Sequence, residues 1–306
     1  MAIIETIVPI FLIILAGYVI KRSGFLKDEF FSDANRFVYF CSLPFLLFTG
    51  IMKSNLSGLS VIAIASVVIP TLVVFFAGLG LGRLMGFSSG SLGTFVQATY
   101  HGNVSYVGLA VVFYMLGEKG LEQGSLLVGF LIITTNALST IILSLTGRRP
   151  GPRHLGRALL PLSKNPVIIS SVVGIAALYV GLPVPKILTR TMLVMANIAL
   201  PLALITIGAS LTTEGLKRTI RTASLATCFK LVVVPALAVL LFKGTGLPPT
   251  VWATSVFLLA TPVATLTYIM AQELGGDTEM ASSAVTLSTL ISPLTYILWA
   301  LVLGIG

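Results

Sequence analysis

A cluster of polar residues interrupts an otherwise apolar segment in the first half of the chain. The stretch QATYHGNVSYVGLAVVFYML contains Gly102, Asn103, Ser105 and Gly108. Glycine weakens a helix by about 1 kcal/mol, so a membrane helix is expected to break or unwind here. An amide can donate to a carboxylate and accept from unwound backbone, which makes Asn103 our first candidate for substrate contact, with Ser105 beside it. Capping of a broken helix end is the alternative role of Asn103.

A matching interruption lies in the second half. The stretch SVFLLATPVATLTYIM has Thr261 and Pro262 at its middle, and Pro262 lies 157 residues after Ser105. Proline removes a backbone donor and costs a helix about 3 kcal/mol. Broken helices leave free peptide groups, and the N-termini of half-helices favour an anionic guest. We predict that the two breaks cross at mid-membrane and bind an anion such as a carboxylate; kinks used only for packing are the alternative.

Lys230, in the stretch ATCFKLVVVP, is the only lysine or arginine that lies away from the ends of a predicted membrane segment. Central burial of such a charge costs about 2.5 to 3.5 kcal/mol on insertion scales, so the side chain should face a cavity or the protein interior. Attraction of an anionic substrate is one role for it. Binding the carbonyls of a broken helix, or extension to the cytoplasmic face, is the alternative.

Other polar residues of the apolar segments are weaker candidates. Asn136 could contact substrate, or it could only hydrogen-bond between helices. His101 could carry a coupling proton, with a neutral packing histidine as the alternative. Hydroxyl groups that could line the pocket belong to Ser42, Thr134, Thr135, Thr261 and Thr265. Such hydroxyls often bond their own backbone instead.

The acidic residues all fall at the ends of the apolar segments or between them. They are Glu5, Asp28, Glu29, Asp33, Glu118, Glu122, Glu214, Glu273, Asp277 and Glu279. A carboxylate proton relay is therefore unsupported, and no paired carboxylates or metal-ligand spacing indicate an intramembrane enzyme. We expect no metal site and no organic cofactor. Na⁺ held by carbonyls and hydroxyls, H⁺ carried by His101, and uniport stay open as modes of coupling.

Membrane-spanning helices must position these residues. The mean hydropathy is +1.03 and charged residues make up only 9% of the 306, which indicates an all-α polytopic membrane protein. About 20 apolar residues form a helix that crosses a hydrocarbon core about 30 Å thick. Ten such segments are predicted, at 5–21, 34–52, 60–82, 91–116, 124–145, 165–181, 188–211, 222–242, 250–271 and 280–303.

The net charge of +9 would suggest a nucleic-acid partner in a soluble protein, but here the basic residues sort by loop. Thirteen lie after the odd-numbered segments: Lys21, Arg22, Lys27, Arg36, Arg83, Arg148, Arg149, Arg153, Arg157, Lys164, Lys217, Arg218 and Arg221. Five lie on the other side: Lys53, Lys119, Lys186, Arg190 and Lys243. This asymmetry predicts a multi-pass protein of the cell inner (plasma) membrane with both termini outside, partnered by the lipid bilayer and not by nucleic acid.

Proline and glycine positions indicate an internal repeat. At a spacing of 157 residues, Pro9 and Pro44 recur as Pro166 and Pro201, and Gly17, Gly24 and Gly58 recur as Gly174, Gly181 and Gly215. Because each half has an odd number of segments, the second half must be inverted relative to the first. We predict repeats at 1–146 and 165–306, joined by a basic cytoplasmic linker at 147–164 that holds a solvated His154.

Several of these motifs together carry a resemblance to a known family. They are HGNVSYVGLA, Leu43-Pro44, Asn165-Pro166, ALPLALITIGASL from Ala199, and Lys230-Leu231 followed by Pro235. In this order the chain resembles the auxin efflux carrier family of membrane permeases, within the bile acid and sodium symporter superfamily. The family often has glycine where Ser105 stands and proline where Ala110 stands, so the geometry of the first break can differ here.

The resemblance implies a fold and a site. It implies two inverted five-helix repeats, a scaffold from segments 1, 2, 6 and 7, and a mobile transport unit from segments 3–5 and 8–10. Segments 4 and 9 would cross at their breaks, Asn136 would match a position that contacts substrate in the plant carriers, and the protein would form a homodimer.

Together these observations predict a non-enzymatic function. We expect a secondary active transporter of small organic anions, such as carboxylates, that works by elevator-like alternating access between the two packings of an inverted repeat. A ligand sensor on a transporter fold is the alternative, and an intramembrane enzyme is a weaker one. Exchange of substrate across proteoliposomes distinguishes a carrier from a sensor.

Overall fold

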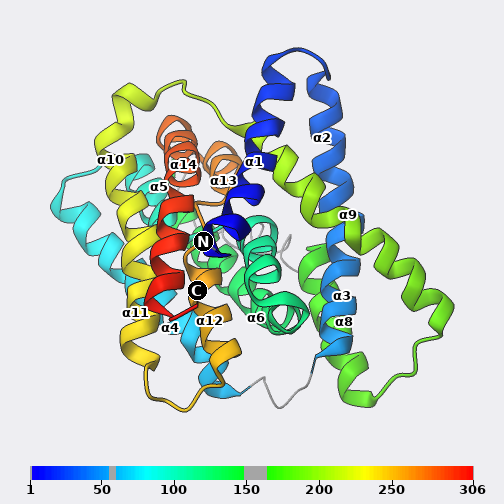
Figure 1. The fold of residues 1–306 in the computed structure, drawn as a ribbon. Helices are drawn as coiled ribbons and strands as arrows, with labels where there is room; N and C mark the ends of the chain where they lie inside the picture. Colours follow the sequence, from blue (N-terminus) through cyan, green and yellow to red (C-terminus); the bar gives the residue numbers. More distant parts are fainter. Residues whose placement is uncertain (1, 55–59, 148–163, 306) are drawn as a thin grey trace.

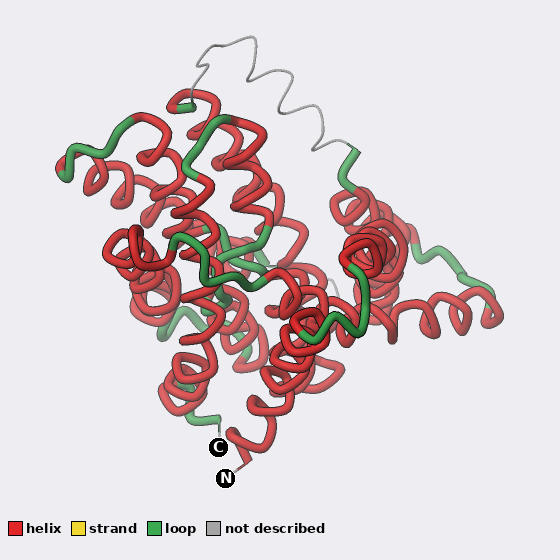
Figure 2. The backbone as a smooth tube through the Cα atoms, turned by 90° about the horizontal axis from the view of Figure 1, so that it is seen from above, coloured by secondary structure: helices red, strands yellow, loops and turns green. Residues whose placement is uncertain are grey.

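The computed structural model describes residues 2–54, 60–147 and 164–305 (Figure 1). The described residues form helices and short connections with no strand, and one isolated bridge pairs Gly102 with Val263 (Figure 2). The predicted all-helical class is therefore confirmed. Most of the predicted linker, including His154, lies outside the described residues.

The elements of the first half follow the predicted order. They are α1 (Ala2–Arg22), α2 (Asp28–Phe37), the π-helical η1 (Val38–Ser42), α3 (Leu43–Lys53), α4 (Val61–Leu84), α5 (Ser89–Tyr100), the π-helical η3 (Val104–Gly108) and α6 (Leu109–Thr146). Together α2, η1 and α3 form one continuous apolar helix over Asp28–Lys53. A π-helical turn is uncommon and often marks a functional position.

The described residues of the second half are also helical. They form α8 (Pro166–Val180), α9 (Lys186–Ser210), α10 (Leu216–Cys228), the π-helical η4 (Phe229–Val233), α11 (Val234–Phe242), α12 (Pro249–Leu259), α13 (Leu266–Leu274) and α14 (Thr278–Val302). Seven helices in the described part are long and apolar enough to cross a membrane, and α8 and α12 are shorter apolar helices. Helices lie on each of the ten predicted ranges.

The connection between the predicted fourth and fifth segments is shorter than expected. The sequence suggested a polar link between residues 116 and 124, but α6 runs through this region with Gly117 as its one non-helical residue. Gly117 has φ 67° and ψ −158°, a backbone conformation that glycine adopts without steric cost. One glycine therefore turns the chain between two long helices.

Replacing Gly117 with alanine should lower stability by about 1 to 3 kcal/mol, because only the backbone strain changes. A Cβ atom at this position meets no heavy atom within 4 Å, so no steric clash adds to the effect. Thermal unfolding in detergent measures the change. Gly80→Ala, in the interior of α4 with similar open space, is the control and should be neutral or stabilising. Equal unfolding temperatures for the two variants would contradict this account of the turn.

The helices pack as two groups. In the scaffold group, α1 and α2 pack on α9, and α3 packs on α8 and α9. In the crossing group, α4 packs on α5, α6, α11 and α12, while α14 packs on α10 and α13. Figure 1 shows α2, α3, α8 and α9 on one side and α4, α5 and α10–α12 on the other, with α1 and α6 between them. The division into a fixed scaffold and a mobile transport unit stays a prediction.

Candidate functional site

The first predicted break is present in the structure. Helix α5 ends at Tyr100 and helical structure resumes at Val104, so His101, Gly102 and Asn103 lie between two half-helices. The Asn103 side chain caps the second half-helix, because its Oδ1 accepts a hydrogen bond from the Tyr106 N–H at 3.3 Å. An asparagine favours this position because its amide oxygen satisfies one of the free N–H groups of the helix start.

The second break pairs directly with the first. Helix α12 ends at Leu259 and α13 begins at Leu266. The Asn103 N–H donates to the Pro262 carbonyl at 2.8 Å, and the Ala264 N–H donates to the His101 carbonyl at 2.9 Å. These bonds place Gly102 opposite Val263 in an antiparallel bridge. The predicted crossing of two broken helices is therefore confirmed.

Gly102 is required by the close approach of three elements. A Cβ atom here would overlap Thr261 Oγ1 and would lie 2.8 Å from Lys230 Nζ. Real Cβ atoms do not approach other atoms this closely, so any larger residue would force the side chains of Thr261 and Lys230 to move. The glycine that weakens the helix also provides the space in which the breaks meet.

Lys230 holds the end of one broken helix. Its side chain is 1% exposed, and its Nζ donates a hydrogen bond to the carbonyl of Leu259, the last residue of α12. A cation at a helix C-terminus is favourable because the last carbonyls carry partial negative charge. Lys230 was expected either to attract an anionic substrate or to bind the carbonyls of a broken helix, and this contact is of the second kind.

The π-helical η4 that carries Lys230 is fixed by a tryptophan. Pro235 has no N–H and cannot bond the carbonyl of Leu231, four residues earlier. The indole Nε1 of Trp299 in α14 donates to this carbonyl at 2.8 Å. Trp299 is only 6% exposed, so this hydrogen bond is buried and links α14 to η4.

Free backbone donors lie at the starts of both second half-helices. Among the hydrogen bonds of the described residues, the N–H groups of Ser105, Thr265 and Leu266 have no acceptor. All three residues are partly buried. Free N–H groups and the positive end of the helix dipole together favour an anion.

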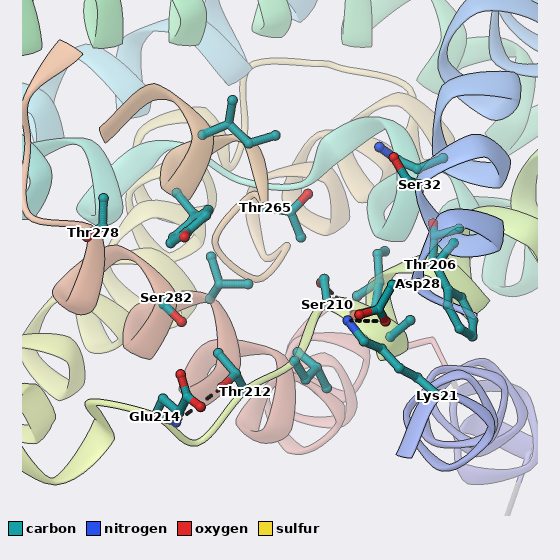
Figure 3. Close-up of a pocket in the computed structure, with 18 of the residues that line it drawn as sticks. Lys21, Asp28, Ser32, Thr206, Ser210, Thr212, Glu214, Thr265, Thr278 and Ser282 are labelled. Carbon is teal, nitrogen blue, oxygen red and sulfur yellow. Dashed lines mark hydrogen bonds and ion pairs between the residues drawn. The ribbon is translucent and has the colours of Figure 1, made fainter. Parts of the chain in front are cut away.

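A cavity of about 950 Å³ lies between the two groups beside these donors. Its polar lining includes Ser32, Asn35, Tyr106, Thr206, Ser210, Thr265, Thr278 and Ser282. Figure 3 shows Thr265 near the centre, Ser32 and Thr206 on the side of α2, and Thr278 and Ser282 on the side of α14. Of the three donor residues, Thr265 lines the cavity. Tyr106, the neighbour of Ser105, also lines it.

Charged residues of the cavity are mostly paired within one wall. Lys21 contacts Asp28 at 3.4 Å, and Arg218 contacts Glu279 at 3.7 Å. With Glu214 the lining has two basic and three acidic groups. The lining therefore has no net positive charge that could attract an anion. The electropositive features of the site are instead the helix starts at the crossing.

The remaining predicted site residues lie around the crossing but outside the cavity lining. Thr261 Oγ1 bonds the Leu258 carbonyl of its own helix at 3.0 Å. The His101 ring bonds Gln97 and Ser139 through Nδ1 at 3.1 and 3.0 Å, the arrangement of a packed histidine. Asn136 is buried in α6, and the buried Ser42 Oγ has no hydrogen-bond partner among the described residues.

Two lining residues were missed as candidates although they join the two groups. The Tyr106 hydroxyl donates to Asn35 Oδ1 at 3.0 Å, which links the crossing to α2 of the scaffold group. Tyr106 belongs to the motif HGNVSYVGLA, but an aromatic residue in an apolar segment carries no polar signal. Asn35 lies in the polar helix Asp28–Phe37, near the predicted boundary where sequence patterns are least reliable.

Comparisons with known proteins agree with this geometry. The chain is 27% identical over 308 residues to an "Uncharacterized transporter" of Methanothermobacter thermautotrophicus, covering 98% of each chain. It is 26% identical over 298 residues to a "Putative malonate transporter" of Rhizobium meliloti, covering 94% of this chain and 92% of the relative. A relative in Methanocaldococcus jannaschii, also named an uncharacterized transporter, is 23% identical and is covered to 98%.

The family comparison covers almost the whole chain. A family described as "Membrane transport protein" matches residues 2–300. The match confirms the resemblance to auxin efflux carriers that was read from the motifs. The chain belongs to this membrane transport protein family.

Proposed function

We propose that this protein is a secondary active transporter of small organic anions, in particular carboxylates. One observation carries the proposal: the two broken helices meet with free N–H groups at Ser105, Thr265 and Leu266, beside a cavity of about 950 Å³. Each free donor can form a charge-assisted hydrogen bond with a carboxylate oxygen. Asn103 and Lys230 then hold the donors in place, and Asn136 and Ser42 support the same region from neighbouring helices.

The transport step follows from the position of the cavity. Because it lies between the scaffold group and the crossing group, movement of one group past the other would carry the bound anion across the membrane in an elevator-like cycle. With the orientation predicted from the basic residues, the large cavity opens to the cytoplasm. The bilayer of the cell inner membrane and a second copy of the chain are the proposed partners, and Na⁺ or H⁺ is the proposed coupling ion.

Malonate is the first substrate to test, because one relative is named for it. Proteoliposomes loaded with unlabelled malonate should take up labelled external malonate by exchange, and empty vesicles should not. A sensor on the same fold would bind malonate without exchange. Absence of exchange for malonate and for a panel of other small mono- and dicarboxylates would contradict the proposal.

A matched pair of substitutions at Thr265 isolates one backbone donor. Thr265→Ala removes the hydroxyl and the γ-methyl group but keeps the N–H, whereas Thr265→Pro also removes the N–H, and the native φ of −58° suits proline. A hydrogen bond to a charged group contributes about 1.5 to 3 kcal/mol, so proline should raise the KM for malonate about tenfold or more above the alanine variant. Equal KM values in the exchange assay would exclude this N–H as a ligand.

A further inference from the structure

A second, smaller cavity of about 300 Å³ lies between the same two groups of helices. Its lining comes from α3, from the part of α6 around Gly117, and from the middle of α9. In Figure 1, α3 lies toward the opposite end of the molecule from the α1–α2 turn, which borders the large cavity. The two cavities therefore lie toward opposite ends of the molecule.

The internal repeat relates the two cavities. Five residues of the small cavity have a partner 157 residues later in the large one: Thr49 with Thr206, Gly50 with Ile207, Lys53 with Ser210, Leu121 with Thr278, and Glu122 with Glu279. Two unrelated linings of these sizes would give about one such match by chance. Equivalent faces of the two repeats therefore form a large opening at one end and a small one at the other.

An ion pair crosses the small cavity between the two groups. Lys53 at the end of α3 contacts Glu118 at the start of the second part of α6, with Nζ and Oε2 3.6 Å apart. Both residues line the small cavity. In the large cavity, by contrast, Lys21–Asp28 lies within the scaffold group and Arg218–Glu279 within the crossing group. Among the described residues, Lys53–Glu118 is the only ion pair that joins the two groups.

We propose that the small cavity is the closed form of the route by which the same organic anion reaches the crossing from the opposite face, and that the Lys53–Glu118 ion pair is the latch that keeps it closed. This inference rests on the proposed transport function. Opening the latch would let the scaffold group and crossing group exchange the two arrangements of the repeat. The small cavity would then widen while the large one narrows.

The latch should have a modest, measurable effect on the balance between the two states. Both side chains are partly exposed, at 44% for Lys53 and 73% for Glu118, and exposed ion pairs are weak. Glu118→Gln should therefore shift the ratio of the two states by up to about fivefold. The shift also has a specific direction, because the small cavity must open as the large cavity closes.

Two equivalent cysteine reporters can follow this shift. Thr49→Cys and Thr206→Cys, each in a background in which Cys41 and Cys228 are serine, place similarly buried thiols in the small and large cavities. A maleimide that crosses the bilayer, such as N-ethylmaleimide, can reach both faces and labels each reporter in proteoliposomes. Glu118→Gln should speed labelling at Thr49→Cys and slow it at Thr206→Cys, each by up to about fivefold. Asn197→Cys, exposed in the same small cavity, is a second reporter.

Controls separate the latch from a general effect of charge. Asp28→Asn breaks an ion pair within one group and should not produce opposite changes at the two reporters. Exchanging the charges, with Lys53→Glu and Glu118→Lys together, should restore the original labelling rates. Unchanged labelling, or changes of the same sign in both cavities, would overturn the latch. Malonate exchange in the same vesicles tests the proposed function separately, since exchange with unchanged labelling would reject only the latch.

Discussion

Gly102→Ala is expected to reduce malonate exchange at least tenfold and to lower the unfolding temperature. The new methyl group would overlap Thr261 Oγ1 and lie 2.5 Å from Lys230 Cε. Overpacking of this kind costs about 1 to 3 kcal/mol, and each 1.4 kcal/mol at the site changes binding or rate about tenfold. Relief of the overlap must move the Thr261 or Lys230 side chain, and a displaced Lys230 would disturb its hydrogen bond to the Leu259 carbonyl at the second break.

The control for Gly102→Ala is Gly80→Ala, since a Cβ atom at Gly80 meets no heavy atom within 4 Å. Gly80→Ala should retain exchange, because alanine favours a helix over glycine by about 1 kcal/mol. Exchange rates in proteoliposomes and unfolding temperatures in detergent are measured for both variants. Wild-type behaviour of Gly102→Ala would show that close contact between the breaks is unnecessary.

Lys230→Met is expected to lower the free energy of unfolding by about 1 to 3 kcal/mol and to slow malonate exchange strongly. Methionine keeps a long apolar side chain but removes the ammonium group, so the Leu259 carbonyl at the end of α12 loses its partner. A buried polar group without a partner carries this cost. The crossing would also lose the favourable charge at the α12 C-terminus.

The sign of the stability change distinguishes the two roles of Lys230. If the ammonium served only to attract substrate, its removal would eliminate a buried charge and leave the empty protein equally or more stable. Lys243→Met, at the exposed end of α11, is the matched control and should change stability by less than about 0.5 kcal/mol. A stable Lys230→Met protein with only a raised KM would contradict the structural role.

The crossing could be predicted from the sequence because it depends on backbone chemistry. Gly102 and Pro262 each weaken a helix locally, and Ser105 and Pro262 lie at equivalent places in the repeat, so the two breaks could be recognised together. The single-glycine turn at Gly117 could not be predicted, because the polar residues that follow it resemble a longer loop. Helix boundaries depend on tertiary packing as much as on local pattern.

The cavity lining was predicted less well than the crossing. Of the named candidates, Thr265 lines the large cavity, whereas Ser42, His101 and Thr261 are packed into the protein interior. Sequence periodicity shows that a polar residue is in a membrane helix but not which neighbour it faces. The Tyr106–Asn35 hydrogen bond joins residues 71 positions apart, and such a pairing is visible only once the helices are packed.

A structure determined with malonate bound tests the central claim most directly. We expect one carboxylate within about 3 Å of the Ser105 N–H and of the Thr265 or Leu266 N–H, between half-helices that remain broken. Malonate bound elsewhere with these donors unoccupied, or unbroken helices through residues 101–103 and 260–265, would contradict the account.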